Sequence, residues 1–353
     1  MAFFGLMPAD NAATRIFCVR PLPRLCEQGI EGESFPPSSP AVFHRLRSPR
    51  RRLRPLLAAL YWYAIVLPAR LTQLPRALAC NVIFVQRGLL RYHSRPVLEA
   101  ALWLIGRRLL GRRLVYHLDD ALYAVAPSER IAQRCRHADV VLTGNADIAA
   151  FARAAGGRVK RLDGWVETSR YRPKRHHDRR PVVIGYTGTF PEHHMGPIAA
   201  ALREVCGDGR ARVRVVSRDP FEVPELEGLL EWERWVPERE FSLFEDFDIG
   251  VMPLEDSEYN RAKEAYKIKE YMAAGLPVVC SPVGHNLAVV DDEVDGLHAA
   301  TDRDWVRQLS RLVEDVELRA SLGAAGRRTV EQRYEAGRQT QRLGELLWEV
   351  AQG

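Results

Sequence analysis

The sequence predicts an α/β fold built from two doubly wound parallel-sheet domains. The chain has 353 residues, a length that suits two domains of ordinary size. Short apolar runs alternate with stretches of helical period, which is typical of parallel strands with helices on both faces of the sheet. This alternation pauses once, in the polar and basic segment Trp165–Arg180, and then restarts. We therefore expect a first domain over residues 1–170 and a second over residues 171–335.

The expected elements follow the chain in order. The strands expected in the first half are Ala2–Met7, Asn81–Gln86, Arg113–Leu118, Asp139–Thr143 and Arg158–Leu162, with helices at Pro96–Leu110 and Ser128–His137. The strands expected in the second half are Pro181–Tyr186, Ala211–Ser217, Glu233–Val236, Asp248–Pro253 and Pro277–Ser281, with helices at Met195–Val205, Arg239–Asp246 and Ala265–Ala274. From Asp302 onward the pattern is helical. In such folds ligands bind beyond the carboxyl ends of the strands.

Composition limits the classes of partner. The net charge is +6, which favours acidic partners such as nucleotides, phosphates, anionic lipid or nucleic acid. No nucleic-acid motif accompanies the charge, so we expect no nucleic-acid partner. The six cysteines show neither a Cys-x-x-Cys pair nor zinc spacing, and the N-terminus lacks the basic residues of a signal peptide. Reduced thiols and a cytoplasmic location are the expectation.

The most informative segment is Asn260–Val279. Gly275 and Pro277 end the predicted helix, and Lys263, Lys267 and Glu270 fall at helical spacing on one stripe. Because a helix N-terminus beyond a parallel strand favours anions, two lysines there suit a diphosphate, and the glutamate could accept hydrogen bonds from hydroxyl groups. The alternative is a solvated amphipathic helix with ordinary Lys–Glu pairs.

The run from Lys263 through Lys267 and Glu270 to Ala-Ala-Gly275-Leu-Pro-Val-Val279, followed by Ser281-Pro-Val-Gly284 and Asp295-Gly296, resembles retaining glycosyltransferases of family 4, the glycosyl transferases group 1 domain. Ile184–Thr189, Asn81–Arg87, Val115–Leu122 and Asp139–Asn145 resemble strands and turns of the same family. The resemblance implies the GT-B fold, two Rossmann-like domains facing a central cleft, with residues 336–353 as a helix that crosses back to the first domain. It also implies that Glu270 contacts the donor ribose. Ala262 stands where the family motif has a second glutamate.

The resemblance implies transfer of a hexose-type sugar from a UDP or GDP type nucleotide sugar to a hydroxyl acceptor, with retention of configuration. The acceptor would be a glycan, a lipid-linked glycan or a small molecule. We expect no cofactor and no metal, because Lys263, Lys267 and the helix dipole can neutralise the leaving diphosphate and no Asp-x-Asp motif of the metal-binding kind is present. Lys267 is therefore counted among the catalytic candidates as well as the donor-binding ones.

Other donor-binding candidates lie in two turns. Gly185 and Gly188 follow a buried strand and would let the backbone approach a phosphate, with Thr189, His193 and His194 next in sequence. The alternative for the two histidines is a polar surface loop. In the second turn, Gly284, His285 and Asn286 are candidates for contacts with the sugar or the phosphates. Base contacts are expected near Arg218.

In the first domain, His117, Asp119 and Asp120 end a strand and could orient or deprotonate an acceptor hydroxyl. The alternative is that one of the aspartates caps the following turn. Arg15 stands in a first loop that lacks the glycines usual in the family, so its charge is a phosphate candidate, against an ordinary exposed arginine. Asn145 is a further phosphate or acceptor candidate at the end of a strand.

The basic and aromatic segment 45–67 allows two interpretations. Arginines precede an apolar run that contains Tyr61, Trp62 and Tyr63, which is typical of a helix lying at an anionic membrane surface. The alternative is a core helix behind a basic loop. Two rival functions also stay open. One is a non-catalytic GT-B-like binding or membrane-associated scaffold protein, and the other is a sugar-nucleotide epimerase or phosphorylase on the same fold.

Overall fold

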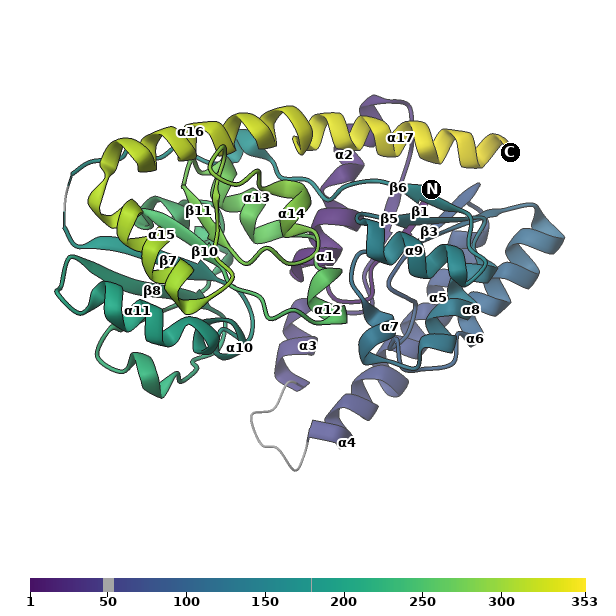
Figure 1. Cartoon of the computed structure of the whole chain (residues 1–353). Coiled ribbons are helices and arrows are strands. Elements are labelled where there is room, and N and C mark those ends of the chain that lie inside the picture. The colour runs from purple at the N-terminus through teal and green to yellow at the C-terminus, as the bar shows by residue number, and fades with distance from the viewer. Residues whose placement is uncertain (47–53, 179) are drawn as a thin grey trace. The chain divides into compact units, whose positions relative to one another are not determined.

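A computed structural model describes residues 1–46, 54–178 and 180–353 of the chain. Its contacts divide the chain into two compact units. Unit 1 is Met1–Asp163 with Gly337–Gly353, and unit 2 is Gly164–Ala336. Each unit holds a six-stranded sheet flanked by helices (Figure 1). The predicted α/β fold with two parallel sheets is confirmed.

The sheet of unit 1 has the strand order β2-β1-β3-β4-β5-β6, with every neighbouring pair parallel. The strands are β1 (Ala2–Phe4), β2 (Glu33–Phe35), β3 (Val82–Gln86), β4 (Arg113–Leu118), β5 (Val140–Thr143) and β6 (Val159–Arg161). The direction in which strands are added reverses between β1 and β3. A reversal of this kind opens a crevice at the carboxyl ends of the two strands.

Helices cover both faces of this sheet. Before β3 lie α1 (Ala12–Thr14), η1 (Arg15–Val19), α2 (Pro21–Glu27), α3 (Pro40–Leu46), α4 (Arg54–Ala59), η2 (Leu60–Val66) and α5 (Leu67–Leu78). After it lie α6 (Val97–Ala101), η3 (Leu102–Leu109), α7 (Leu122–Val125), α8 (Ser128–His137), α9 (Ala146–Ala154) and finally α17 (Ala336–Gln352). The π-helical η2 joins α4 and α5 without a break. Figure 1 shows α17 on the opposite side of the sheet from α5, α6 and α8.

The sheet of unit 2 has the order β12-β11-β10-β7-β8-β9 and is also parallel throughout. Its strands are β7 (Val182–Thr187), β8 (Ala211–Ser217), β9 (Leu230–Arg234), β10 (Ile249–Met252), β11 (Val278–Cys280) and β12 (Leu297–His298). The order reverses between β7 and β10, so the crevice of this unit is expected at the carboxyl ends of those two strands.

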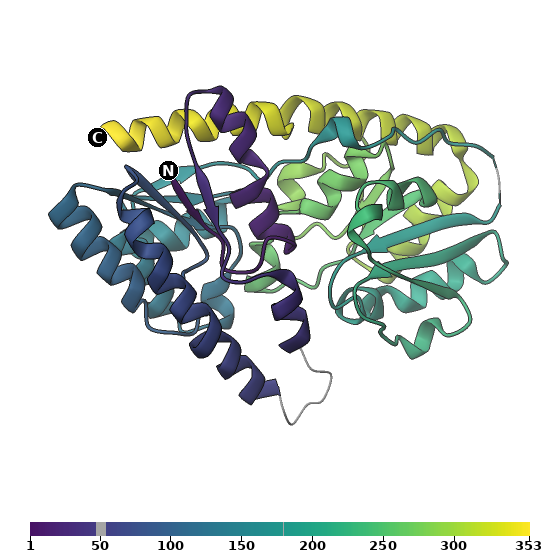
Figure 2. The ribbon, with the colours of Figure 1, turned by 180° about the vertical axis from the view of Figure 1, so that it is seen from behind.

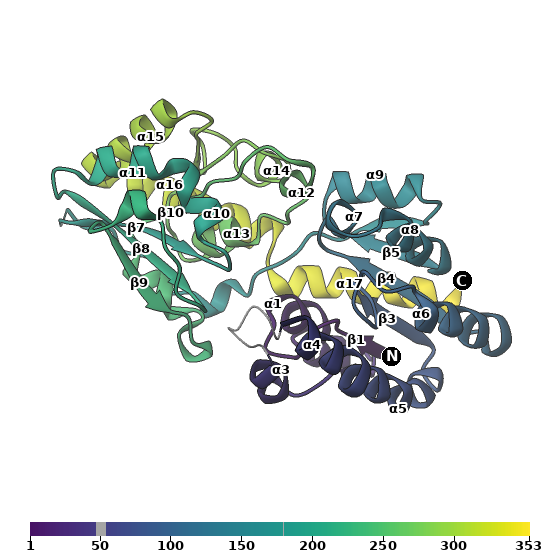
Figure 3. The same ribbon diagram turned by 90° about the horizontal axis from the view of Figure 1, so that it is seen from below.

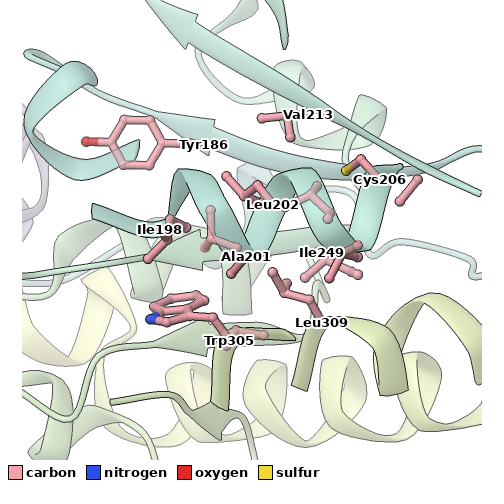
Figure 4. Packing of buried hydrophobic residues seen from close by; sticks show 14 of the residues in the cluster. Tyr186, Ile198, Ala201, Leu202, Cys206, Val213, Ile249, Trp305 and Leu309 are labelled. Carbon is pink, nitrogen blue, oxygen red and sulfur yellow. The ribbon is translucent and has the colours of Figure 1, made fainter. Parts of the chain in front are cut away.

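The helices of unit 2 include several short turns. They are η4 (Thr168–Arg170), α10 (Glu192–Met195), η5 (Gly196–Ile198), α11 (Ala199–Cys206), η6 (Pro224–Leu226), η7 (Pro237–Arg239), η8 (Ser242–Asp246), α12 (Glu258–Arg261), α13 (Tyr266–Ala273), α14 (Asn286–Val289), α15 (Asp302–Glu314) and α16 (Val316–Arg333). Figure 4 shows how Leu202 of α11 and Trp305 and Leu309 of α15 pack with Ile249 of β10. Burial of each large side chain of this kind contributes about 1.5–3 kcal/mol to folding.

Several element predictions need correction. β2 was not expected, because only one of its three side chains is buried and it therefore shows no apolar run. The expected helix Arg239–Asp246 is instead the pair of short 3₁₀ turns η7 and η8, and the expected strand Glu233–Val236 lies a few residues earlier, as β9. The expected linker Trp165–Arg180 packs into unit 2, because Trp165 and Tyr171 are buried there.

Candidate functional site

The turn after β7 is the starting point of the candidate site, because it stands at the reversal between β7 and β10. Gly188 has a φ of 153°, which only glycine adopts readily. A Cβ built on Gly188 would overlap Cε of Lys267 and lie 2.9 Å from its Nζ. The Lys267 ammonium, from α13, also stands 5.6 Å from the centre of the Tyr186 ring at the end of β7. The structure thus brings Gly188 and Lys267 together, as candidates from two separate motifs.

Lys263 reaches this region by a different route from the one predicted. The residues from Lys263 to Ala274 do not form one helical stripe, because Ala265 has a φ of 51° and interrupts the helix. α13 begins at Tyr266, and the Lys263 ammonium lies 5.1 Å from the centre of the Tyr259 ring of α12. The predicted single stripe is therefore wrong, although both lysines still act on the same neighbour.

That neighbour is His194, which is buried on α10. Its Nδ1 lies 3.1 Å from the carbonyl oxygen of Pro253, just after β10. Burial, together with the charges of Lys267 and Lys263, lowers the pKa of His194 to about 3. His194 is consequently neutral at physiological pH, so the positive charge of the site comes from the lysines. Figure 3 shows α10 and α13 at the same edge of unit 2.

The other two residues predicted beside this turn are exposed. Thr189 follows Gly188 on the surface. His193 points to solvent, with Nε2 4.0 Å from Glu192. Their donor contacts stay predictions.

Glu270 lies one turn after Lys267 on α13. Its Oε1 accepts a hydrogen bond of 3.0 Å from the buried hydroxyl of Tyr171. Burial, followed by the nearby Glu270 carboxylate, raises the pKa of Tyr171 well above its usual range, so the phenol remains a donor. The bond fixes the orientation of the carboxylate that the sequence assigned to the ribose. Ala262, where the family has a glutamate, is fully buried.

Gly185 has a packing explanation. A Cβ on this residue would overlap the ring of Phe247, which lies directly against the backbone of β7. Close packing alone therefore accounts for a glycine here, and the phosphate contact of Gly185 stays a prediction.

The loop after β11 is tied to α12. Gly284 has a φ of 53°, and a Cβ there would overlap the backbone of Arg261. The amide of His285 donates to the carbonyl oxygen of Arg261 over 3.2 Å. Asn286 is buried, and its Nδ2 donates to the carbonyl oxygen of Ser281 over 3.0 Å. These contacts hold the start of the Lys263 segment beside the end of β11.

In unit 1, the candidates at the end of β4 form a cluster with a residue that the sequence analysis did not single out. Arg87 donates two hydrogen bonds of 2.8 Å to Asp119, and Nε2 of Gln86 donates a third of 3.0 Å. The same guanidinium lies 3.6 Å from Asp120. Although burial opposes it, the Arg87 charge holds the pKa of Asp119 below its usual value. Arg87 directly follows the predicted strand Asn81–Gln86, and this position at the end of a strand could have marked it as a candidate site residue.

His117 differs from Asp119 in its surroundings. Its ring packs against Phe17 and Phe84, with ring centres 4.4 and 5.5 Å away. Burial lowers the pKa of His117 to about 4, so the imidazole is neutral at physiological pH. Within the described residues its Nδ1 has no hydrogen-bond partner. The neutral imidazole can accept a hydrogen bond, but with a pKa of about 4 it is, like the ion-paired Asp119, a weak base.

The remaining unit 1 candidates have local structural contacts. The Asn145 side chain caps α9 by accepting a hydrogen bond of 2.9 Å from the amide of Ile148. Arg15 donates to the carbonyl oxygen of Asp10 over 2.6 Å within the first loop. Capping explains Asn145 without a ligand. Among the residues that the structure describes, no group of three or more His, Cys, Asp or Glu side chains is placed to hold a metal ion.

Comparison with known families matches unit 2. Residues 181–315 match the family model described as glycosyl transferases group 1. The matched range contains the Gly188 turn, α13 and the loop after β11, but not Tyr171. Comparison with curated protein sequences gave no significant match.

Solved structures match along the whole chain. Anabaena Alr3699/HepE, in complex with UDP and glucose, is 16% identical with a TM-score of 0.71, and the match covers 99% of both chains. Sucrose-phosphate synthase from Thermosynechococcus elongatus is 14% identical with a TM-score of 0.74, covering 99% of this chain and 98% of that one. A glycosyltransferase from Rickettsia africae ESF-5 is 9% identical with a TM-score of 0.65, over 99% and 98%. At these identities the likeness shows the fold.

The fold and the family match agree with each other. The two parallel-sheet units have the GT-B architecture of these structures, and the group 1 match falls on unit 2 alone. We conclude that this chain is a GT-B protein that carries a glycosyltransferase domain.

Proposed function

We propose that the chain transfers a hexose-type sugar from a nucleotide diphosphate sugar to a hydroxyl acceptor, with retention of configuration and without a metal ion. In this proposal residues 171–335 bind the donor and residues 1–170 bind the acceptor. The observation that carries it is the Lys267 ammonium over the Gly188 turn, within the group 1 match. The HepE complexes with UDP and with UDP-glucose favour UDP over GDP.

The donor side of the proposal is electrostatic. Lys267 and Lys263 would stabilise the negative charge that develops on the leaving diphosphate, a role that an ammonium group fulfils without a metal. Because burial, assisted by the charges of these two lysines, keeps His194 neutral, the positive charge of this site comes from the lysines and not from His194. Glu270, oriented by Tyr171, would accept hydrogen bonds from the ribose hydroxyls.

The acceptor side divides two tasks between neighbouring residues. Neutral His117 would accept a hydrogen bond from the acceptor hydroxyl and take its proton as the new bond to the sugar makes that oxygen strongly acidic, because a pKa of about 4 leaves the imidazole unprotonated but only weakly basic. Asp119, already paired with Arg87, would orient the hydroxyl instead of removing its proton. We place the reaction in the cytoplasm, in line with the cysteine usage of the sequence.

The test is a screen of UDP and GDP sugars for release of the nucleotide diphosphate, with and without acceptors. We expect turnover with a UDP sugar and a product of retained configuration by NMR. Lys267→Ala should lower kcat/KM by about 10²–10³-fold, the usual loss when one group stabilising transition-state charge is removed. Lys160→Ala, which removes the same charge from an ion pair with Glu349 in unit 1, should leave it unchanged.

Other outcomes would assign the rival functions. Nucleotide binding without turnover in the presence of every acceptor class would indicate a non-catalytic binding protein. Release of UDP that needs no acceptor, or that depends on inorganic phosphate, would indicate an epimerase or a phosphorylase. Absence of both binding and turnover would contradict the proposal.

A further inference from the structure

In unit 1, the elements α4, η2 and α5 form one continuous helix that has apolar side chains on both of its sides. Tyr61, Val66 and Arg70 face inward and are buried, which is the expected core side. Leu56, Leu60, Tyr63 and Leu71 recur at spacings of four, three and eight residues on the outer side, and all are exposed. The outer side of a surface helix is normally polar, so this pattern needs a separate explanation. Figure 3 shows α4 and α5 as parts of one continuous helix at the edge of unit 1.

A second helix, which packs against the end of α5, also exposes apolar side chains. Leu104 and Leu109 of η3 are also exposed, at 55% and 73%. The end of α5 packs against η3, because Nε of Arg112 donates to the carbonyl oxygen of Leu78 over 2.9 Å and the Leu78 side chain lies against Gly106. In Figure 2 the two helices run alongside each other. We call Leu56, Leu60, Tyr63, Leu71, Leu104 and Leu109 the apolar outer face.

The charge of the surrounding sequence is one-sided. Residues 34–98 contain eleven arginines, no lysine, and no aspartate or glutamate, although the whole chain has a net charge of only +6. Within the described part of this stretch, Arg45, Arg76, Arg91 and Arg95 are exposed, and Arg76 is paired with Glu33. Arg45 belongs to α3, which lies beside the start of this helix because Phe43 of α3 packs against Tyr61 of η2 with ring centres 5.3 Å apart. Positive charge therefore lies beside the start of the apolar outer face.

We propose that the apolar outer face docks on the surface of an anionic lipid bilayer. Exposed leucines and a tyrosine insert at the boundary between headgroups and acyl chains, and flanking arginines are attracted to anionic headgroups. No helix in the described ranges is both long and apolar enough to cross a bilayer, so the contact is peripheral. The core interpretation of segment 45–67 fits the buried side of the helix, and this proposal takes up the membrane interpretation for its exposed side.

Two other occupants fit the face less well. A second copy would bring two acid-free, arginine-rich stretches together, and like charges would oppose that association. Single-stranded nucleic acid uses aromatic side chains as stacking platforms, whereas five of the six residues of the face are leucines. The expected contact segment 45–67 includes residues 47–53, which lie outside the described residues, and the face is defined without them.

The experiment is co-sedimentation of the full chain with vesicles of phosphatidylcholine alone or mixed with phosphatidylglycerol. Neither nucleotide nor acceptor is added, so the result is independent of the proposed transferase activity. We expect binding to the anionic vesicles that weakens at high salt. Leu56→Ser with Leu71→Ser should reduce partitioning about tenfold or more, because each substitution removes several methylene groups that bury in the interface.

A matched control comes from unit 2. Leu287→Ser with Val294→Ser removes two apolar side chains that are 52% and 64% exposed, close to the 52% and 67% of Leu71 and Leu56. It should not change vesicle binding. Circular dichroism of both double variants confirms that they are folded. The proposal is overturned if the wild-type chain ignores anionic vesicles, or if both double variants bind them as the wild type does. Self-association without lipid that Leu56→Ser with Leu71→Ser abolishes would assign the face to a second copy instead.

Discussion

At the scale of single residues, burial and neighbouring charges decide which groups can act as acids, bases or cations. His117 and His194 are both neutral at physiological pH, His117 because of burial and His194 because of burial assisted by two lysines. Asp119 is held ionised by Arg87. The sequence places such residues at the ends of strands, but it does not show which of them is already paired.

The pH dependence of stability tests this picture at His117. A histidine has a pKa of about 6.5 in an unfolded chain, against about 4 for folded His117, so protonation favours the unfolded state. The stability that depends on a neutral His117 is fully present above pH 6.5 and is lost as the pH falls toward 4. Between pH 6.5 and 5 the loss should be about 2 kcal/mol.

Urea unfolding of the wild type and of His117→Gln at several pH values measures this contribution. The variant should show a smaller decrease over the same interval, because it has no imidazole to protonate at that position. His193→Gln, which removes an exposed histidine of unit 2, is the control and should follow the wild type. Equal slopes for wild type and His117→Gln would show that His117 is not a buried neutral imidazole.

The residues that sequence reasoning missed share one property. Arg87 lies in the left-handed region with a φ of 64° and is held there by Asp119, which is distant in sequence. Tyr171 was assigned to a linker, yet its hydroxyl orients Glu270. In both cases the role depends on a contact between distant segments, which periodicity and composition do not encode.

At the scale of elements, the turn after β7 brings together a glycine and a lysine from different motifs. Gly188→Ala should displace Lys267, because the added Cβ would overlap Cε of its side chain and Lys267 would move away from the turn. We expect UDP binding about tenfold weaker, with part of the loss due to backbone strain at a φ of 153°.

Gly209→Ala is a control that separates the effect of backbone strain from the effect of displacing the Lys267 side chain. Gly209 also has a positive φ, of 76°, but a Cβ there meets nothing within 4 Å. That variant should lose stability in urea while binding UDP as the wild type does. UDP titration of both variants is the measurement. Equal affinities of Gly188→Ala and the wild type for UDP would show that the turn after β7 does not contact the ligand.

Elements with strong periodicity could be predicted, and elements defined by single backbone angles could not. The strands β3, β4, β7 and β8 were expected within a residue or two, because β3, β4 and β7 are largely apolar runs and β8 alternates valines with arginines before its apolar end. The predicted helical stripe from Lys263 fails at Ala265, whose left-handed conformation is unusual for alanine and has no sequence signal. The two-residue β12 is too short to show any period.

At the scale of the whole molecule, the alternation of strands and helices was enough to predict two parallel-sheet units. The order of the strands in each sheet could not be predicted from composition and periodicity, because it depends on which strands pair after each crossover connection. The reversal of order between β7 and β10 nevertheless placed the Gly188 turn and Lys267 where such folds bind ligands. The excess of positive charge in residues 34–98, compared with the rest of the chain, likewise becomes visible only when a long stretch of sequence is considered.

The most direct test of the account is calorimetric titration of the full chain with UDP and with uridine. If Lys267 binds the diphosphate, Lys267→Ala should weaken UDP binding at least tenfold, about 1.4 kcal/mol, and leave uridine binding unchanged. Lys160→Ala should affect neither ligand. Equal affinity of the wild type and Lys267→Ala for UDP would contradict the central claim that this ammonium, lying over Gly188, forms the phosphate site.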